Sequence, residues 1–296
     1  MAHRSLWFAL VAILAACAST PSAGPAADRD ALRVAAFDFP ESQIIAELYA
    51  LALEGRGIPV ERQGAVGPRE VVAVAMQAGH VDLVPEYLGS LYRYLGGSEG
   101  ADVDSLRSQL EPRGLVPLAE ARASNTNTAV MARPQAVDWD VATLTELALT
   151  GRRVRLGGPA ECPDRPFCLP GLRDAYGLDV RDFTALGSSA EVAEALRLGL
   201  VDVGVMFTTD AALTDPGLVS LTDDRDLQPP ENVVPVIRQE ALDRWGPRAR
   251  EAVESISGAL TTDALIELNA SVAEGHSPEE AAAAWLAGID EDRSGP

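Results

Sequence analysis

Few residues of this chain have the types and spacing that catalysis requires. All 24 basic residues are arginine, which excludes Schiff-base lysine chemistry and a P-loop lysine. Beyond the N-terminal segment only His80 and His276 remain, and neither stands near a nucleophile motif such as GxSxG. A Ser-His-Asp or Cys-His mechanism needs an oriented imidazole. The chain is therefore predicted to be a binding protein rather than an enzyme, and to need no cofactor.

One segment of the chain is repeated 120 residues later. Gly79 and Asp82 in GHVDLVPEY match Gly199 and Asp202 in GLVDVGVMF. Two carboxylates could serve as a general acid and a general base. Their identical place at the start of each repeated strand favours a structural role in the turn instead.

The first copy of the repeat ends in an aromatic residue where α/β proteins bind ligands. Its apolar strand ends in Pro85-Glu86-Tyr87, and a helix starts near Leu88. Open α/β sheets bind ligands outside the carboxyl ends of their strands. The second copy places Phe207 at the matching strand end. Two similar halves predict a cleft between two lobes, with Tyr87 and Phe207 on opposite walls.

The alternation of strands and helices along the chain predicts an α/β protein. It indicates mostly parallel sheets with right-handed crossovers. Residues 127–134 and 232–238 are strands of similar size and pattern, and we expect them to cross between the lobes. The predicted first lobe comprises residues 31–128 and 232–296, and the second comprises residues 129–231. The alternative is one large doubly wound domain.

The first 17 residues predict export and membrane anchoring. His3 and Arg4 precede an apolar run that is too short to span a bilayer. The run closes in LAAC, which resembles the bacterial lipobox, whose cysteine is lipidated. Residues 18–30 form a small-residue tether. We expect an extracytoplasmic protein anchored to the cell membrane only through a lipid on Cys17. A plain signal peptide is the alternative.

Net charge argues against one class of partner, and the spacing of two cysteines argues against a metal site. The net charge of −20 argues against nucleic acid, whose phosphates would be repelled. In an oxidising compartment the close pair Cys162 and Cys168 favours a disulfide over a metal site. The two remaining histidines are far from these cysteines in sequence, which argues against zinc.

Several motifs occur in the order found in one transport family. They include FDFPESQIIAELYALALEGRGIPVE, GHVDLVPEYLGSLYRYLGG, PAECPDRPFCLPGLRDAYGL, VDVGVMFTTDAAL and QPPENVVPVIR. The chain resembles the substrate-binding proteins of osmoprotectant ABC importers of the glycine betaine, choline and carnitine type, over about residues 32–273. The resemblance implies a type II periplasmic-binding-protein fold, in which two α/β lobes are joined by two crossing strands. It also implies a permease with a cytoplasmic ATPase as the partner.

The resemblance implies an aromatic cage for a quaternary ammonium group. Aromatic faces attract a methylated ammonium, which cannot donate strong hydrogen bonds. Position by position, the resemblance assigns the cage to Tyr87, Asn127, Phe207 and Glu231. Ser90 follows Tyr87 by about one helical turn. Asn127 and Glu231 are not aromatic. A different small amine or an amino-acid-like ligand therefore remains an alternative.

Two charged residues could recognise the charges of a ligand. Glu231 offers a carboxylate to an amine or a quaternary cation, and the alternative is a solvated acid at the hinge. Arg165, inside the predicted disulfide loop, offers a guanidinium fork to a ligand carboxylate. The alternative is a surface arginine.

Four smaller polar residues are further candidates. Thr208 and Thr209 follow the second repeated strand and could donate hydroxyl hydrogen bonds to the ligand. Thr209 could equally cap the helix begun by Asp210. Asp38 and Ser42, in the first strand-to-helix turn, face the ligand or cap the first helix, and capping is favoured.

The sequence thus predicts a monomeric, lipid-anchored solute-binding protein. It would capture a small quaternary-ammonium or related zwitterionic or cationic solute between its lobes and deliver it to an ABC permease. A ligand-sensing domain and an extracellular enzyme on the same fold are the alternatives.

Overall fold

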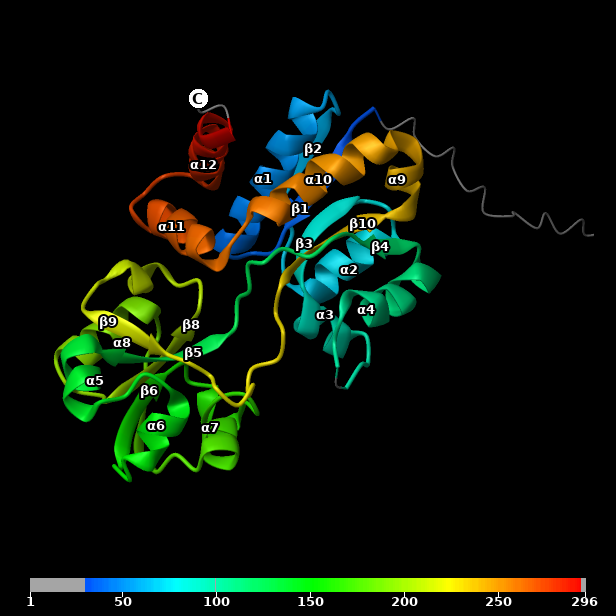
Figure 1. Cartoon of the computed structure of the whole chain (residues 1–296). Helices are drawn as coiled ribbons and strands as arrows, with labels where there is room; N and C mark the ends of the chain where they lie inside the picture. Colours follow the sequence, from blue (N-terminus) through cyan, green and yellow to red (C-terminus); the bar gives the residue numbers. More distant parts are fainter. Residues whose placement is uncertain (1–29, 99, 294–296) are drawn as a thin grey trace, which may run out of the picture. The chain divides into compact units, whose positions relative to one another are not determined.

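Two five-stranded sheets organise the chain in a computed structural model that describes residues 30–98 and 100–293 (Figure 1). Cys17, the predicted signal segment and nearly all of the tether lie outside the described residues. The first sheet has the order β2 (Val60–Ala65), β1 (Leu32–Ala36), β3 (Leu83–Tyr87), β10 (Val233–Arg238) and β4 (Leu115–Pro117). The second has the order β7 (Val180–Ala185), β6 (Val154–Gly158), β8 (Val203–Phe207), β5 (Asn127–Ala132) and β9 (Leu218–Leu221).

The two sheets share one topology. In each, the first three strands are parallel, and the fourth runs antiparallel to its neighbours. The fourth strand follows a connection from the other sheet: β10 returns after the second sheet, and β5 follows the first. This arrangement confirms the predicted fold of two α/β lobes.

The connecting segments run side by side where the chain passes between the sheets. Ser124 and Asn232 form an isolated antiparallel bridge just before β5 and β10. β5 lies in the second sheet from its first residue, since Asn127 pairs with Phe207 and Thr128 with Met206. Asn127 and Thr128 therefore belong to the second sheet, although the predicted first lobe included them.

Helices cover both sheets. The helices that precede or follow the strands of the first sheet are α1 (Pro40–Gly55), α2 (Arg69–Gln77), α3 (Leu88–Tyr94), α4 (Val103–Leu110), η1 (Glu111–Arg113), α9 (Gln239–Trp245), α10 (Pro247–Ala259), α11 (Thr262–Ala273) and α12 (Pro278–Arg293). Those around the second are α5 (Arg133–Trp139), α6 (Leu144–Leu149), η2 (Cys162–Asp164), α7 (Leu169–Tyr176), α8 (Ser189–Arg197) and η3 (Ala211–Thr214). In Figure 1 the orange α10 packs against the blue α1, far from it in sequence. None of the helices in the described ranges combines the length and hydropathy of a membrane span.

The sequence pattern explains why these strands are central. All five residues of β1 and all five of β3 are buried. Strands covered on both faces by helices read as nearly continuous apolar runs. α1 starts at Pro40, whose fixed φ suits the first helical position. The chain therefore turns from β1 into α1 with Phe37 and Phe39 at the carboxyl end of the strand.

The repeated aspartates hold the same position in the two sheets. Asp82 accepts hydrogen bonds from the Arg33 backbone nitrogen, Nε and Nη2 at 3.1, 2.9 and 2.8 Å. Asp202 accepts the same three bonds from Arg155 at 2.8, 3.0 and 2.6 Å. Each pair fastens the turn before the third strand to the neighbouring strand. The predicted structural role of both aspartates is confirmed.

We expect Asp82→Asn to lower the free energy of unfolding by about 3 kcal/mol, because one broken partner leaves a buried charge uncompensated. Asp202→Asn should cost less, because the side chain of Arg155 is 31% exposed and that of Arg33 only 10%. Asp182→Asn, in an exposed pair, is the control and should change stability by less than about 0.5 kcal/mol. Urea unfolding measures all three, and equal losses for Asp82→Asn and Asp182→Asn would contradict the role.

The effect of Asp82 on stability should depend on pH. Burial alone would raise the pKa of Asp82, but hydrogen bonds and charge from Arg33 and Arg238 outweigh it and lower the pKa. A lowered folded-state pKa stabilises the fold above the unfolded value of about 3.9. The stability difference between the wild type and Asp82→Asn should therefore shrink as the pH falls below about 4, as urea unfolding at several pH values would measure. A difference that grows as the pH falls would contradict this sign.

Candidate functional site

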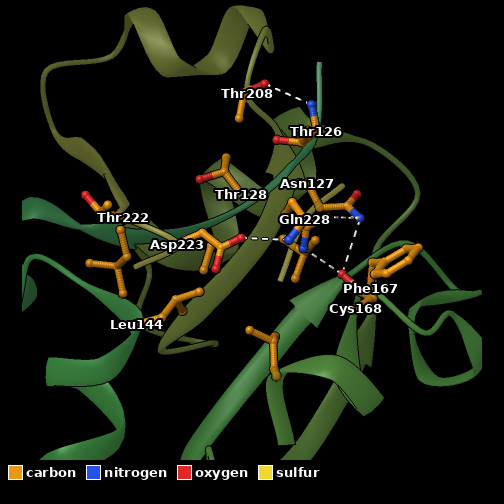
Figure 2. Close-up of a pocket in the computed structure, with 14 residues that line it drawn as sticks. Thr126, Asn127, Thr128, Leu144, Phe167, Cys168, Thr208, Thr222, Asp223 and Gln228 are labelled. Carbon is orange, nitrogen blue, oxygen red and sulfur yellow. Dashed lines mark hydrogen bonds between the residues drawn. The ribbon is translucent and has the colours of Figure 1, made fainter. Parts of the chain in front are cut away.

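A cavity of about 250 Å³ opens at the second sheet (Figure 2). It is smaller than the roughly 300–1,000 Å³ typical of pockets for drug-sized ligands, so it suits a small solute. Its polar wall consists of hydroxyl and amide side chains, from Thr126, Asn127, Thr128, Thr208, Thr222 and Gln228. Its other lining residues are Ala129, Leu144, Phe167, Cys168, Leu172, Val205, Leu221 and Asp223.

Two amides fix the part of the cavity wall that carries Phe167. Gln228 Nε2 donates to the Phe167 carbonyl oxygen at 2.8 Å. Asn127 Nδ2 donates to Gln228 Oε1 at 3.3 Å and lies 3.5 Å from the same carbonyl (Figure 2). Asn127 thus lines the cavity as a hydrogen-bonding residue rather than as an aromatic one.

Asp223 is the one acidic residue among the described lining residues, and it organises the loop after β9. Its Oδ1 accepts hydrogen bonds from the Tyr176 hydroxyl and from Leu227 N, and its Oδ2 accepts one from Gln228 N at 2.7 Å. Burial, followed by the hydrogen bond with Asp223, raises the pKa of Tyr176. Tyr176 therefore stays a neutral donor, and its hydroxyl holds the Asp223 carboxylate in place beside the cavity.

Tyr87 lies at the carboxyl end of β3, as the sequence predicts, within an aromatic cluster. Its side chain is buried, its ring centroid is 6.1 Å from that of Phe39, and Phe39 lies 5.9 Å from Phe37. The Tyr87 hydroxyl donates to Glu41 Oε1 at 2.6 Å. Burial first, and then the charge of Glu41, raises the pKa of Tyr87 well above its usual value. The phenol therefore remains protonated and can donate to Glu41.

Glu41 joins four segments of the chain. Besides Tyr87, it accepts hydrogen bonds from Asn125 Nδ2 at 2.8 Å and from Asn269 Nδ2 at 2.9 Å. Asn269 Nδ2 also donates to the Thr209 carbonyl oxygen at 2.7 Å. The carboxylate is buried, and it connects α1 with the end of β3, the segment before β5 and α11. Asn269 extends this network to the turn after β8. Sequence analysis missed Glu41, Asn125 and Asn269, because their partners lie far apart along the chain.

Glu231 already pairs with a cation of its own chain. Its Oε1 accepts from Arg93 Nη2 at 2.7 Å and from Ser90 Oγ at 2.8 Å, and its Oε2 accepts from Ser90 N at 2.9 Å. The guanidinium of Arg93 also lies 5.2 Å from the ring centroid of Phe167. Glu231 is buried, so the alternative of a solvated acid is wrong. The roles of Arg93 and Phe167 beside Glu231 were not predicted from the sequence either.

The remaining residues of the second sheet differ in exposure. Phe207 ends β8 opposite Asn127 and is 53% exposed. Thr208 lines the cavity, where its Oγ1 accepts from Thr126 N and donates to the Ser124 carbonyl oxygen. Thr209 is buried.

Two capping alternatives are corrected by the structure. Phe39 is the N-cap residue of α1 and makes no side-chain capping bond, so neither Asp38 nor Ser42 caps this helix. Ser42 Oγ instead accepts from Phe37 N at 2.9 Å, which fixes the turn that carries the aromatic cluster. Asp38 is exposed. Asp210, rather than Thr209, caps η3 through Ala212 N.

The predicted disulfide is present. Cys162 and Cys168 are bonded, with their Cα atoms 5.2 Å apart. Cys168 and the preceding Phe167 line the cavity, so the disulfide restricts the loop that supplies this wall. Arg165, in the same loop, is exposed and is not among the residues that line the cavity.

Comparison with known proteins gives consistent results. The family model described as the substrate binding domain of the ABC-type glycine betaine transport system matches residues 30–288. The chain is 30% identical to a glycine-betaine-binding protein of Pseudomonas aeruginosa, over 92% of this chain and 91% of that protein. It is 26% identical to the glycine betaine-binding protein YehZ of Escherichia coli, over 83% and 86% of the two chains.

A solved structure titled as a glycine betaine/carnitine/choline ABC transporter is similar in fold. It superposes with a TM-score of 0.79 at 21% identity, covering 86% of this chain and 97% of its own.

We expect Glu41→Gln to lower the free energy of unfolding by about 2–3 kcal/mol. Hydrogen bonds to a charged group contribute about 1.5–3 kcal/mol, and the glutamine amide would point a donor at a donor. Glu54→Gln, on the exposed side of the same helix, is the matched control and should cost at most about 1 kcal/mol. Urea unfolding measures both. A Glu41→Gln protein with the unfolding free energy of the wild type would contradict the role of Glu41 as acceptor of three hydrogen bonds.

Proposed function

The chain belongs to the family of substrate-binding domains of ABC-type glycine betaine transport systems, and we propose that Tyr87 and the cavity beside β5 hold its solute. Proteins of this family are extracytoplasmic, bind small solutes and deliver them to a permease. The chain is a transporter component of this kind. We propose that it binds its solute without catalysing a reaction.

The solute that we propose is a small quaternary-ammonium compound. The single observation that carries the proposal is the Tyr87–Glu41 pair at the end of β3, next to Phe39. Aromatic faces attract a methylated ammonium, and a carboxylate behind the phenol adds negative potential. The names of the relatives support the same ligand class, since both are called glycine betaine-binding proteins.

We propose that the solute lies between the aromatic cluster of the first sheet and the cavity of the second. The chain connects the two through Glu41, Asn125 and Thr126, because Asn125 donates to Glu41 and Thr126 lines the cavity. The lobes, with a boundary moved to Asn127, would close around the solute by bending at the two connecting segments. The exposed ring of Phe207 is suited to cover the ammonium group from the second lobe.

Membrane anchoring and oligomeric state complete the proposal. We propose that Cys17 carries a lipid and that residues 18–30 tether the folded part, as the sequence pattern predicts. We also propose that the protein acts as a monomer and that no nucleic acid binds to it, given its net charge of −20.

Tyr87→Ala should weaken binding of the best quaternary-ammonium ligand at least tenfold, because a desolvated cation–π contact is worth about 1–2 kcal/mol. Tyr87→Phe keeps the ring and loses only the hydrogen bond to Glu41. Because one hydrogen bond contributes about 0.5–1.5 kcal/mol, its affinity should stay within about fivefold of the wild type. Titration calorimetry with choline, glycine betaine and carnitine measures both variants.

Tyr94→Ala is the matched control, because Tyr94 is 43% exposed on α3 and should leave affinity unchanged. Equal affinity of Tyr87→Ala and the wild type would rule out the aromatic wall. No heat from any quaternary-ammonium ligand with the folded wild type would overturn the proposed ligand class.

A further inference from the structure

The second connecting segment, residues 228–232, is attached on both sides of a single residue. Gln228 is held by the second lobe, because its Nε2 donates to the Phe167 carbonyl oxygen at 2.8 Å. Two residues later, the Pro230 carbonyl oxygen accepts a hydrogen bond from Gly89 N at 3.0 Å, near the start of α3. Pro229 alone stands between these attachments, so the bonds around Pro229 are the place where this segment can bend.

The part of the segment after Pro229 is packed tightly against α3. A Cβ atom on Gly89 would lie 2.7 Å from the Pro230 carbonyl oxygen and 3.2 Å from Glu231 Oε1. Ser90 N and Ser90 Oγ both donate to the Glu231 carboxylate. The chain from Pro230 onward therefore moves with α3, and the fixed φ angles of the two prolines leave few torsion angles for bending.

Arg93, in the last turn of α3, makes contacts on both sides of this bend. Its Nη2 donates to Glu231 Oε1 at 2.7 Å, on the α3 side. Its guanidinium lies 5.2 Å from the ring centroid of Phe167, on the other side. Phe167 belongs to the loop closed by the disulfide of Cys162 and Cys168. Because the two partners are attached to different lobes, bending at the segment would separate the guanidinium from the ring.

Arg165, in the same disulfide loop, makes no connection of this kind. It is exposed, and within the described part of the chain its side chain has no hydrogen bond or ion pair. The guanidinium of Arg93 is instead held between a carboxylate and a ring. One further contact also joins the lobes, since Asn269 donates to the Thr209 carbonyl oxygen at 2.7 Å. The contact of Arg93 with Phe167 therefore shifts the balance of lobe arrangements and does not fix it alone.

We infer that Arg93 is a positioning residue, which stabilises the lobe arrangement of the structure by its contact with the Phe167 ring and does not touch the solute. Arg93 is not among the residues that line the cavity. An exposed cation–π contact corresponds to a factor of about two to five in an equilibrium constant. Only molecules in the binding-competent arrangement take up solute, so the contact also raises the apparent affinity. This last step alone rests on the proposed function.

Distances between spin labels on the two lobes test the contact without any solute. Labels on Ser108→Cys in α4 and Thr184→Cys in β7, both exposed, suit the full-length chain with Cys17→Ser as the background. We expect double electron–electron resonance to show one main distance when Arg93 and Phe167 are intact. Phe167→Leu removes the ring and keeps an apolar side chain, and it should raise the ratio of other distances to the main one about two- to fivefold.

The variants of Arg93 and Phe167 separate this contact from a general loosening of the loop. Arg93→Lys keeps the charge beside Glu231 but loses the flat guanidinium, so it should shift the distances in the same direction. The double variant should shift them no further than Phe167→Leu alone, because both changes remove one contact. Phe167→Tyr keeps the ring, and Arg165→Lys is the matched control in the same loop; both should give the wild-type distances.

Two results would overturn the inference, in variants that circular dichroism shows to be folded. One is a Phe167→Leu protein with the wild-type distances. The other is a double variant whose shift is the product of the two single shifts.

Calorimetry then measures the consequence for binding. Arg93→Lys should weaken the binding of choline and of glycine betaine by one common factor of at most about five, because it lowers the competent fraction and contacts neither solute. A loss confined to one solute would show that Arg93 contacts it, and would overturn its role as a positioning residue. Silence of the wild type with both solutes would overturn the proposed function, whereas the distances would still decide whether Arg93 holds the lobes.

Discussion

The buried carboxylate of Glu41 is the interaction on which the geometry of the site depends. A charge removed from water is tolerated only when hydrogen bonds replace its hydration, and its three donors come from three distant segments. This requirement holds the end of β3, the segment before β5 and α11 together. It also holds the hydroxyl end of Tyr87 in place, because the phenol donates to Glu41 Oε1. Among the described residues its three donors are neutral, so we propose that a solute cation beside the ring supplies the opposite charge.

The repeated architecture explains why the site lies where it does. Both sheets have the same strand order, and Asp82 and Asp202 fasten the same turn in each through Arg33 and Arg155. The strand after each aspartate therefore ends at an equivalent position, with an aromatic residue on β3 and on β8. Each sheet also includes a strand that follows a connection from the other, so both connecting segments reach the site. The two aromatic residues that we propose as walls of the site, Tyr87 and Phe207, therefore occupy equivalent strand ends.

Local patterns in the sequence predicted the local features, and long-range contacts escaped them. Strand ends, the disulfide and the paired aspartates follow from apolar runs, short spacing and the internal repeat. The partner of Glu231 could not be predicted, because Arg93 is 138 residues away and no periodicity links them. The same holds for Glu41 and Asn269, which are 228 residues apart. The prediction that Ser42 caps the first helix was wrong, because its hydroxyl accepts a hydrogen bond from Phe37 N in the preceding turn.

A crystal structure of the protein with bound choline tests the central claim most directly. The account predicts the trimethylammonium group within about 6 Å of the Tyr87 ring centroid. It also predicts the hydroxyl of choline in the cavity lined by Thr128 and Thr222, with Tyr87 still bonded to Glu41. Choline bound away from Tyr87, or with its ammonium group in the cavity and its hydroxyl against the ring, would contradict the account.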